Sequence, residues 1–320
     1  MATVAFHTLG CKVNSYESEA MLEIFKKRGY ETIDFESPAD VYVINTCTVT
    51  NTGDSKSRQM IRKAHRTNPE AVICVVGCYS QVASEEITGI EGVSVVLGTQ
   101  HRASIVDFVE EYKSTHKQIV KIENVMKVSR FEDLSIHAFE NKTRAFLKIQ
   151  DGCNNFCTYC IIPYARGGVR SRPKEDVLKQ AQELVDRGFV EIVLTGIHTA
   201  GYGVDLDNYS FYDLLVDLTT KIKGLKRLRI SSIEMSQVSD EIIELIGKSP
   251  IIVDHLHIPI QSGTDSILRR MARHYNTAEF EKKYFELKEA LPGISITTDV
   301  IVGFPGETDE EFEDTLDVVE

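Results

Sequence analysis

The sequence lacks several features that would place it in a common class. Its 320 residues contain no run of about 18 apolar residues, which is the length of a membrane-spanning helix. The first residues, MATVAFHTLGCK, lack the basic start and apolar stretch of a secretion signal, and the chain has no low-complexity tract. We therefore expect a cytoplasmic, globular protein with no role at a membrane.

Positive charge is also scarce. The chain carries 36 Lys and Arg residues against 48 Asp and Glu, which gives a formal net charge of −12. This balance argues against a surface that coats nucleic acid broadly, although a local basic patch is compatible with it. The length predicts two domains, each large enough for its own core.

The first third of the chain alternates between short apolar runs and helical patterns. The predicted strands, rich in β-branched residues, are 3–9, 41–46, 72–77 and 93–98. The predicted helices lie near 15–28, 54–66, 82–88 and 102–112. Strands that alternate with helices indicate a parallel sheet covered on both faces. We predict an α/β fold that begins with a doubly wound parallel-sheet domain over residues 1–115.

Residues 116–142 lose this regularity, and we interpret them as a polar connector with a short strand or two. From 143 to 320 the alternation resumes, and repeated βα units indicate a full or partial (β/α) barrel. The predicted strands are 144–150, 191–197, 227–233, 255–260 and 294–303. The predicted helices are 174–187, 211–222, 239–247, 264–273 and 277–290. The sequence ends inside the helical pattern DEEFEDTLDVVE without a cap, so we expect a longer protein.

Three of the seven cysteines crowd one loop. Cys153, Cys157 and Cys160 form the spacing C-x3-C-x2-C directly after a predicted strand, and Gly152 beside them favours a loop. In a reducing cytosol, clustered cysteines serve metals or redox chemistry more often than disulfides. A structural zinc ion is almost always bound by four ligands, usually from two C-x2-C pairs, and the sequence has no second such pair. An iron–sulfur cluster is the other candidate, and three thiolates would leave one iron open to an outside ligand.

This loop resembles the cluster motif of the radical S-adenosylmethionine (SAM) enzymes, which follows the first strand of a (β/α) barrel. The resemblance implies that SAM chelates the open iron and is cleaved by electron transfer to a 5′-deoxyadenosyl radical. It implies that Tyr159 packs near the adenine and that Thr195 and Gly196, in LTGI, meet the SAM amino group. The strand ISSIE (230–234) would occupy the position of the ribose contacts. A plain strand-end turn is the alternative for Thr195 and Gly196.

The other four cysteines lie in the first domain. Cys11, Cys47 and Cys78 each follow a predicted strand, whereas Cys74 lies in the middle of VICVVG. The carboxyl ends of parallel strands share one edge of the sheet, where ligands bind. Glycines in LGCK and VGCY permit close backbone approach. We therefore predict a second three-cysteine cluster, with isolated core thiols as the alternative, and a buried core position for Cys74.

The two sets of cysteines together resemble the radical SAM methylthiotransferases over nearly the whole chain. The matching segments are HTLGCKVNSYESE, VINTCTVT, SRQMIRKAHR, VVGCYSQ, CNNFCTYCIIPYARGGVRSR, IPIQSGTDSILRRM and VGFPGETDEEF. The resemblance implies two 4Fe–4S clusters: an auxiliary cluster on Cys11, Cys47 and Cys78, and a radical SAM cluster in the barrel. One SAM would methylate sulfur at the auxiliary cluster. A second would supply the radical that opens an unactivated C–H bond, to which the methylated sulfur is transferred. Further implied partners are an electron donor such as flavodoxin or ferredoxin and a sulfur source, with the chain acting as a monomer.

Local sequence indicates one branch of this family. TLGCKVN and TGIHTAGYG (195–203) resemble the branch that acts on N6-threonylcarbamoyladenosine in tRNA, with a 2-methylthio product at position 37 beside the anticodon. On this resemblance His198 and Tyr202 are candidates for contact with the modified base. Full members of the family also carry a small C-terminal RNA-binding β-domain, and on this resemblance we expect it to be missing from this sequence.

Other functions are compatible with the same residues. Within the class, the substrate could be another modified adenosine or a ribosomal protein. A radical SAM enzyme that uses its second cluster only as an electron relay is a third possibility. A non-catalytic iron–sulfur sensor is the alternative from a different class, and it would not cleave SAM.

Two groups of arginines are candidates for binding anions. Arg58, Arg62 and Arg66 share one helical face at i, i+4 and i+8 and would suit the tRNA backbone, although a solvated face explains them equally well. A second group follows the barrel cysteines and could neutralise SAM, the clusters or RNA phosphate, or pair with acidic helices. These residues are Arg166, Arg170 and Arg172.

Overall fold

The computed structural model describes residues 1–134, 136 and 143–320, so the end of the predicted connector lies outside the described residues. The chain divides into two compact units. Unit 1 comprises Met1–Lys142 with Ile161–Arg170, and unit 2 comprises Thr143–Cys160 with Ser171–Glu320. The segment 161–170, which follows the barrel cysteines in sequence, therefore belongs to the first unit. Within the described ranges, no helix is both long and apolar enough to cross a membrane.

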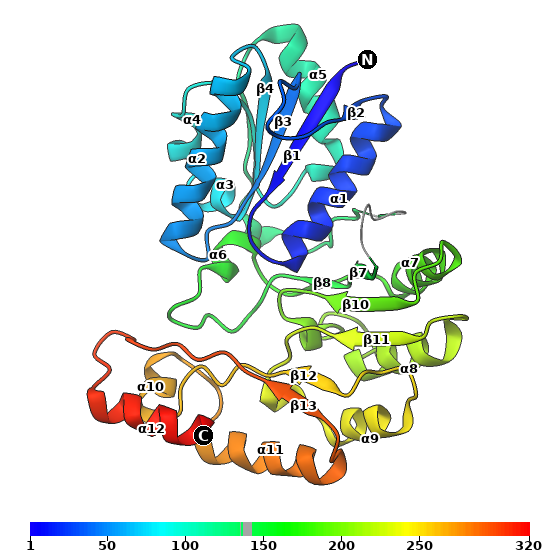
Figure 1. The fold of residues 1–320 in the computed structure, drawn as a ribbon, viewed down its shortest axis with the longest axis vertical. Coiled ribbons are helices and arrows are strands. Elements are labelled where there is room, and N and C mark those ends of the chain that lie inside the picture. Colours follow the sequence, from blue (N-terminus) through cyan, green and yellow to red (C-terminus); the bar gives the residue numbers. More distant parts are fainter. Residues whose placement is uncertain (135, 137–142) are drawn as a thin grey trace. The chain divides into compact units, whose positions relative to one another are not determined.

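Unit 1 is built on one six-stranded parallel sheet (Figure 1). The strands are β1 (Thr3–Thr8), β2 (Glu31–Thr32), β3 (Val41–Thr46), β4 (Val72–Gly77), β5 (Val93–Leu97) and β6 (Ile119–Lys121). They are ordered β2-β1-β3-β4-β5-β6, and every adjacent pair is parallel. The predicted doubly wound sheet is confirmed, and β6 lies in the segment interpreted as a connector.

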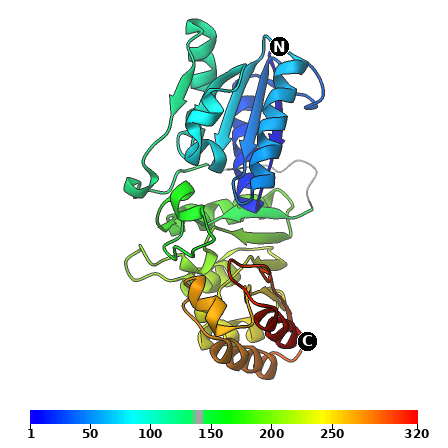
Figure 2. The ribbon, with the colours of Figure 1, turned by 90° about the vertical axis from the view of Figure 1, so that its left-hand side faces the viewer.

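Helices cover both faces of this sheet, because side chains alternate along each strand. The helices are α1 (Lys12–Lys27), α2 (Asn51–Thr67), α3 (Cys78–Val82), α4 (Ser84–Thr88), α5 (Ile105–Thr115) and α6 (Ile162–Arg166). Residues of α1 and α5 pack with Val43, Cys74 and Val76 on one face. Residues of α2 and α4 pack with Ile44 and Val75 on the other, and Figure 2 views the unit from the α2 side. Cys74 is fully buried in the first of these cores, as predicted.

The strand order brings the ends of particular strands together. The chain leaves β1 to form β2 on one side and then returns to place β3 on the other side of β1. Ligands of doubly wound sheets bind at the carboxyl ends of the strands beside such a reversal. The ends of β1, β3 and β4 are therefore consecutive along the edge where a ligand is expected.

Unit 2 is a partial (β/α) barrel, as predicted. Its strands are β7 (Ala145–Lys148), β8 (Gln150–Asp151), β9 (Arg170–Ser171, whose first residue belongs to unit 1), β10 (Glu191–Thr195), β11 (Arg227–Ile230), β12 (His255–His257) and β13 (Ser295–Thr297). The ladders run β11-β10-β7 and β12-β13, and parallel bridges from Leu228 to Ile252 and from Ser232 to His257 continue the sheet between them. Strands β8 and β9 form a separate two-stranded sheet. The predicted strand 294–303 is shorter than expected, since regular pairing covers only Ser295–Thr297.

The helices of unit 2 connect successive strands along the chain, except α12, which follows the last strand. They are α7 (Lys174–Asp186), α8 (Phe211–Lys221), α9 (Asp240–Lys248), α10 (Asp265–Arg270), α11 (Thr277–Ala290) and α12 (Asp309–Val319). Short 3-10 turns complete the described elements of both units: η1 (Arg102–Ser104), η2 (Val125–Lys127), η3 (Thr199–Gly201) and η4 (Met235–Gln237). The loops that follow the strands carry the candidate site residues of this unit.

Candidate active site

The three cysteines predicted for the auxiliary site stand at three consecutive strand ends. Cys11 is the N-cap residue of α1 after β1, Cys47 directly follows β3, and Cys78 is the first residue of α3 after β4. Because β1, β3 and β4 are neighbours in a parallel sheet, their carboxyl ends hold the three thiols at one edge. The fold thus unites residues that lie up to 67 positions apart (78 − 11 = 67).

Glycines keep the backbone close to these thiols. A Cβ atom on Gly10, whose φ is +102°, would lie 2.8 Å from Cys47 Cβ and 3.0 Å from its Sγ. A thiolate at Cys11 would raise the pKa of both Cys47 and Cys78, so Cys11 lies within electrostatic reach of both. In the described part of the chain, no group of three or more His, Cys, Asp or Glu side chains is arranged to hold a single metal ion. Thiolates of a multi-iron cluster bind different irons, so they are spaced more widely than the ligands of one ion.

Burial shapes the chemistry of these thiols. Burial raises the pKa of Cys47. The backbone N–H of Val49 donates to this thiol and lowers the same pKa by a smaller amount. Burial also raises the pKa of Cys78 to about 11. Both thiols are therefore protonated at neutral pH in the metal-free chain, and a metal must displace the protons when it binds. N–H groups that donate to sulfur are also a means of setting the reduction potential of a bound cluster.

We expect Gly77→Ala to lower the free energy of unfolding of the metal-free chain by about 2–4 kcal/mol. Gly77 has φ +103° and ψ −161°, and an added Cβ would lie 2.6 Å from Asn45 Oδ1 and from the Thr46 carbonyl oxygen. Gly29→Ala is the matched control, because Gly29 has φ +82° but no described atom within 4 Å of the added Cβ. Gly29→Ala should lower the free energy of unfolding by about 1 kcal/mol. Urea denaturation measures both, and equal losses would contradict the close-approach role of Gly77.

The barrel cysteines lie on a loop at the start of unit 2. Gly152 has φ +75° and Phe156 has φ +47°, so the backbone turns sharply before and inside the motif. Burial raises the pKa of Cys153 to about 11, and thiolates at Cys160 or Cys157 would raise it further. The backbone N–H of Asn155 donates to the Cys153 thiol. The role of the three thiols as ligands of one cluster stays a prediction.

An arginine and a glutamate from later in the chain hold the loop. Arg273 Nη1 donates to Cys157 Sγ at 3.2 Å, and Arg273 Nη2 lies 3.0 Å from Glu234 Oε1. The same carboxylate oxygen accepts from Asn155 Nδ2 at 2.9 Å. Thr158 N donates to the Met271 carbonyl at 3.1 Å. Sequence reasoning did not single out Arg273 or Glu234, since neither lies near the cysteines in the chain.

Gln150 joins the cysteine loop to the turn after β10. Its Nε2 donates to the carbonyls of Asp151 at 2.7 Å and Gly152 at 2.6 Å. Its Oε1 accepts from the backbone N–H groups of Ile197 at 3.0 Å and His198 at 2.9 Å. This fully buried side chain was also missed. A polar residue at the end of the apolar run AFLKIQ was the available signal.

The residues predicted to bind SAM lie around this loop. Thr195 is buried, and its hydroxyl donates to the Val193 carbonyl at 3.2 Å. A Cβ on Gly196 would lie 2.9 Å from Gln150 Oε1, so only glycine fits beside the Gln150 amide. Tyr159 is 37% exposed and interacts electrostatically with Arg273 and Cys157. Roles in SAM binding for these three residues stay predictions.

His198 and Tyr202 occupy different environments. Burial lowers the pKa of His198, which lies within the electrostatic reach of Glu234 and Arg273. It is therefore a neutral imidazole near the barrel cysteines. Tyr202 is only 1% exposed, and its hydroxyl donates to the Arg172 carbonyl at 2.9 Å. Tyr202 is therefore a buried packing residue with a hydrogen-bonded hydroxyl. The geometry offers no support for its contact with a modified base.

The first arginine group lies on α2. Arg62 and Arg66 are exposed, whereas Arg58 donates to the Tyr79 hydroxyl at 2.5 Å and to Glu86 Oε1 at 3.0 Å. Arg58 is thus partly neutralised, and the other two offer the more accessible charges. Binding of tRNA by this face stays a prediction.

The second arginine group is buried. Arg170 Nη1 donates to the Gly168 carbonyl at 3.0 Å, and the Arg172 side chain donates to Gln180. Arg170 and Arg172 are each 2% exposed, so the geometry gives no support for contacts with RNA phosphate. The third member, Arg166, lies in unit 1 and is fully buried.

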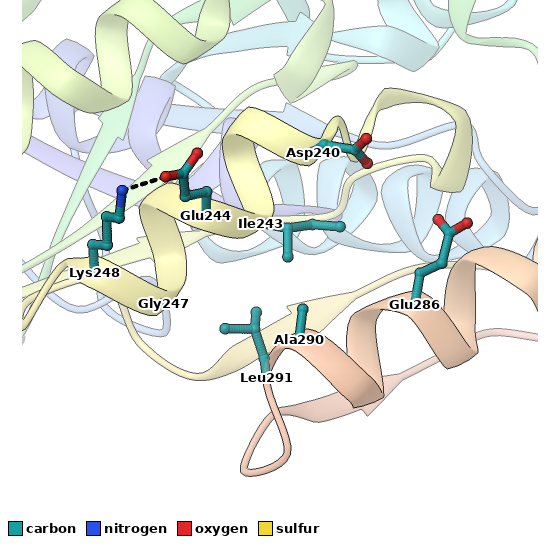
Figure 3. Close-up of a pocket in the computed structure, with 8 residues that line it drawn as sticks. All are labelled: Asp240, Ile243, Glu244, Gly247, Lys248, Glu286, Ala290 and Leu291. Atoms are coloured by element: carbon teal, nitrogen blue, oxygen red, sulfur yellow. Dashed lines mark hydrogen bonds and ion pairs between the residues drawn. The ribbon is translucent and has the colours of Figure 1, made fainter.

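A groove of about 550 Å³ between α9 and α11 lies apart from these residues (Figure 3). Ile243, Ala290 and Leu291 point into the space, and Lys248 pairs with Glu244 along one turn of α9. None of its lining residues is a predicted site residue. The groove is a surface feature of the helix layer.

Comparisons with known proteins agree with the cysteine pattern. A model of the radical SAM superfamily matches residues 147–319, and one described as uncharacterized protein family UPF0004 matches residues 3–98. A threonylcarbamoyladenosine tRNA methylthiotransferase MtaB from Bacillus subtilis (strain 168) is 58% identical over 319 residues, which cover 100% of this chain and 71% of that protein. A protein of the same name from Aquifex aeolicus (strain VF5) is 41% identical over 98% of this chain and 76% of its own length.

A solved structure shares the fold at low sequence identity. It is the radical SAM methyltransferase TsrM from Kitasatospora setae with cobalamin and a [4Fe-4S] cluster bound, matched with a TM-score of 0.70 at 15% identity over 100% of this chain and 73% of that one. The superfamily match spans more than half of the chain, and SAM and an iron–sulfur cluster follow from it. By these matches, the chain belongs to the radical SAM tRNA methylthiotransferases of the MtaB type.

Proposed function

We propose that this protein converts N6-threonylcarbamoyladenosine at position 37 of tRNA to its 2-methylthio derivative, using SAM and two 4Fe–4S clusters. The observation that carries the proposal is the second cysteine set, Cys11, Cys47 and Cys78, at three consecutive strand ends. A radical SAM enzyme that only cleaves SAM needs the barrel set alone. The MtaB relatives support the choice of substrate.

The residues present fit two clusters of this kind. Each set contributes three cysteines and no other ligand type, which suits iron–sulfur clusters and leaves one iron of each open. Cys153, Cys157 and Cys160 would hold the radical SAM cluster, and the first-domain trio would hold the auxiliary one. When bound, SAM and this cluster would supply the radical that removes hydrogen from an unactivated C–H bond.

The chain's own residues position and shield this chemistry. Arg273 fixes the Cys157 sulfur and is itself held by Glu234, so the loop is set before any cofactor binds. Gln150 fixes the turn that carries Thr195 and Gly196 against the start of the loop. In the proposed reaction Thr195, Gly196 and Tyr159 contact SAM. The imidazole of His198 stays neutral near the substrate.

Substrate and partners follow from the same proposal. The exposed arginines of α2, Arg62 and Arg66, would bind tRNA phosphates, with Arg58 contributing in part. Reductive cleavage needs an electron donor such as flavodoxin or ferredoxin, and thiolation needs a sulfur source. We infer that the chain acts as a monomer in the cytoplasm, where it would meet tRNA.

Nucleoside mass spectrometry of tRNA tests the proposed function. Cells that lack this activity should contain unmodified threonylcarbamoyladenosine, and the gene should restore the 2-methylthio form, whereas a Cys157→Ser gene should not. The 2-methylthio form of isopentenyladenosine in the same samples is the control for substrate choice. A restored isopentenyladenosine product, or methylthiolated ribosomal protein with no change in threonylcarbamoyladenosine, would contradict the proposal.

A further inference from the structure

The segment after the barrel cysteines is built into the interior of unit 1. Thr99 Oγ1 donates to the Ala165 carbonyl at 2.8 Å in a buried position. Gly167 has φ +76°, and a Cβ there would lie 2.2 Å from the Val125 carbonyl oxygen, so the backbones touch at this point. Helix α6 also packs against α3, the helix that Cys78 begins. These contacts place the last residue of α6, Arg166, inside the unit with no exposed surface.

Arg166 binds a carboxylate and an amide of α1. Its Nη1 lies 2.8 Å from Glu17 Oε1, and its Nη2 donates to Glu17 Oε2 at 3.1 Å and to Asn14 Oδ1 at 2.8 Å. The Asn14 amide in turn donates to the carbonyls of Leu9 at 2.7 Å and Thr46 at 3.0 Å. Leu9 and Thr46 lie just before the loops that carry Cys11 and Cys47. The Arg166 side chain is therefore fixed to the same backbone that presents these two cysteines.

The guanidinium also reaches the cysteines. Arg166 hydrogen-bonds the Cys78 side chain, and its positive charge acts on both Cys78 and Cys47, lowering the pKa of each against the larger effect of burial. A buried cation is costly unless it is paired and hydrogen-bonded. Glu17 meets that requirement here, and it is fully buried as well.

A second buried arginine lies behind Glu17. Glu17 also lies 2.5 Å from Arg102 Nη1, and Arg102 binds Glu132 through Nε at 2.9 Å and Nη2 at 2.7 Å. Two carboxylates and two guanidiniums thus alternate from Glu132 to Arg166. A 4Fe–4S cluster on three thiolates would add negative charge at the Arg166 end, where the positive charge is already in place.

We propose that Arg166 is a positioning residue of the auxiliary cluster: it donates to the Cys78 sulfur and holds a fixed positive charge beside the cluster, which raises the reduction potential. Charge and hydrogen bonds at the sulfurs are established controls of that potential. A positive charge stabilises the reduced cluster, which carries one more electron. The inference rests on the proposed function, because it requires the auxiliary cluster.

The test uses the full chain with Cys153, Cys157 and Cys160 changed to alanine, so that iron binds only at the auxiliary cysteines. After anaerobic reconstitution with iron and sulfide, the midpoint potential is measured by dithionite titration followed by electron paramagnetic resonance. Arg166→Met should shift the midpoint potential to more negative values. Arg166→Lys should cause a smaller shift, since lysine keeps the positive charge but lacks the planar guanidinium that donates several hydrogen bonds. Arg28→Met, an exposed arginine at the end of α1, makes the same charge change and should leave the potential unchanged.

Each outcome separates the inference from the proposed function. An unchanged potential in a folded, loaded Arg166→Met chain overturns the role of Arg166. If Arg166→Met does not fold, the double variant Arg166→Met, Glu17→Gln is compared with Glu17→Gln alone, so that the two chains differ only in the charge of residue 166. Failure of the parent background to take up iron contradicts the two-cluster function instead, and the inference falls with it.

Discussion

Replacing Cys157 with serine is expected to reduce SAM cleavage at least about 100-fold, whereas Cys47→Ser should leave cleavage measurable and eliminate the thiolated product. A serine hydroxyl is a poor replacement for a thiolate on iron. Cys157 is buried in unit 2 and hydrogen-bonded by Arg273, while Cys47 lies at a strand end of unit 1. The two changes therefore affect different clusters and different halves of the reaction.

The measurement follows both products in one reduced reaction with tRNA. Chromatography quantifies 5′-deoxyadenosine, and mass spectrometry of the digested tRNA quantifies the 2-methylthio nucleoside. Cys74→Ala is the control for loss of a thiol, because Cys74 is in the core of unit 1 and should not be needed for either product. Equal loss of SAM cleavage in the Cys157 and Cys47 variants would contradict this division of labour.

Glu17→Ala is expected to lower the free energy of unfolding of the metal-free chain by about 3–5 kcal/mol. Glu17 has no exposed surface and pairs with Arg166 at 2.8 Å and Arg102 at 2.5 Å, both of them also fully buried. Without the carboxylate, Arg102 keeps Glu132, but Arg166 loses its charged partner. Loss of this carboxylate from a fully buried guanidinium is the source of the large expected loss.

A second glutamate on the same helix provides the control for this change. Glu23 pairs with Lys27 at 3.0 Å across one turn of α1, and Lys27 is 61% exposed. Glu23→Ala should therefore cost about 0.5 kcal/mol. Urea denaturation followed by circular dichroism measures both variants, and a Glu17→Ala chain within about 1 kcal/mol of the parent would exclude the buried network as a major source of stability.

The fold was predictable where the sequence repeats a local pattern. The strands of unit 1 are apolar runs such as VYVINT and VICVVG, which are buried along their whole length in the structure. The cysteines that follow them could be grouped because parallel strands share one carboxyl edge. The short strands β2 and β6 were harder to predict, since a strand of two or three residues leaves almost no periodicity.

The supporting contacts of the site could not be predicted in the same way. Arg166 and Glu17 are 149 positions apart, and Arg273 and Cys157 are 116 apart. No spacing rule links such pairs, and a charged residue in a sequence is more often exposed than buried. The structure shows that both cysteine sets have the same kind of support: one buried arginine that hydrogen-bonds a cysteine and is held by a glutamate.

The iron and sulfide content of the reconstituted chain tests the two-cluster account most directly. The parent chain, reconstituted without oxygen, should bind about eight iron atoms and about eight sulfides. The triple variant in which Cys11, Cys47 and Cys78 are alanine should bind about half of each and still cleave SAM. A triple variant that keeps the parent's full iron and sulfide content would show that these cysteines hold no cluster, and it would contradict the account.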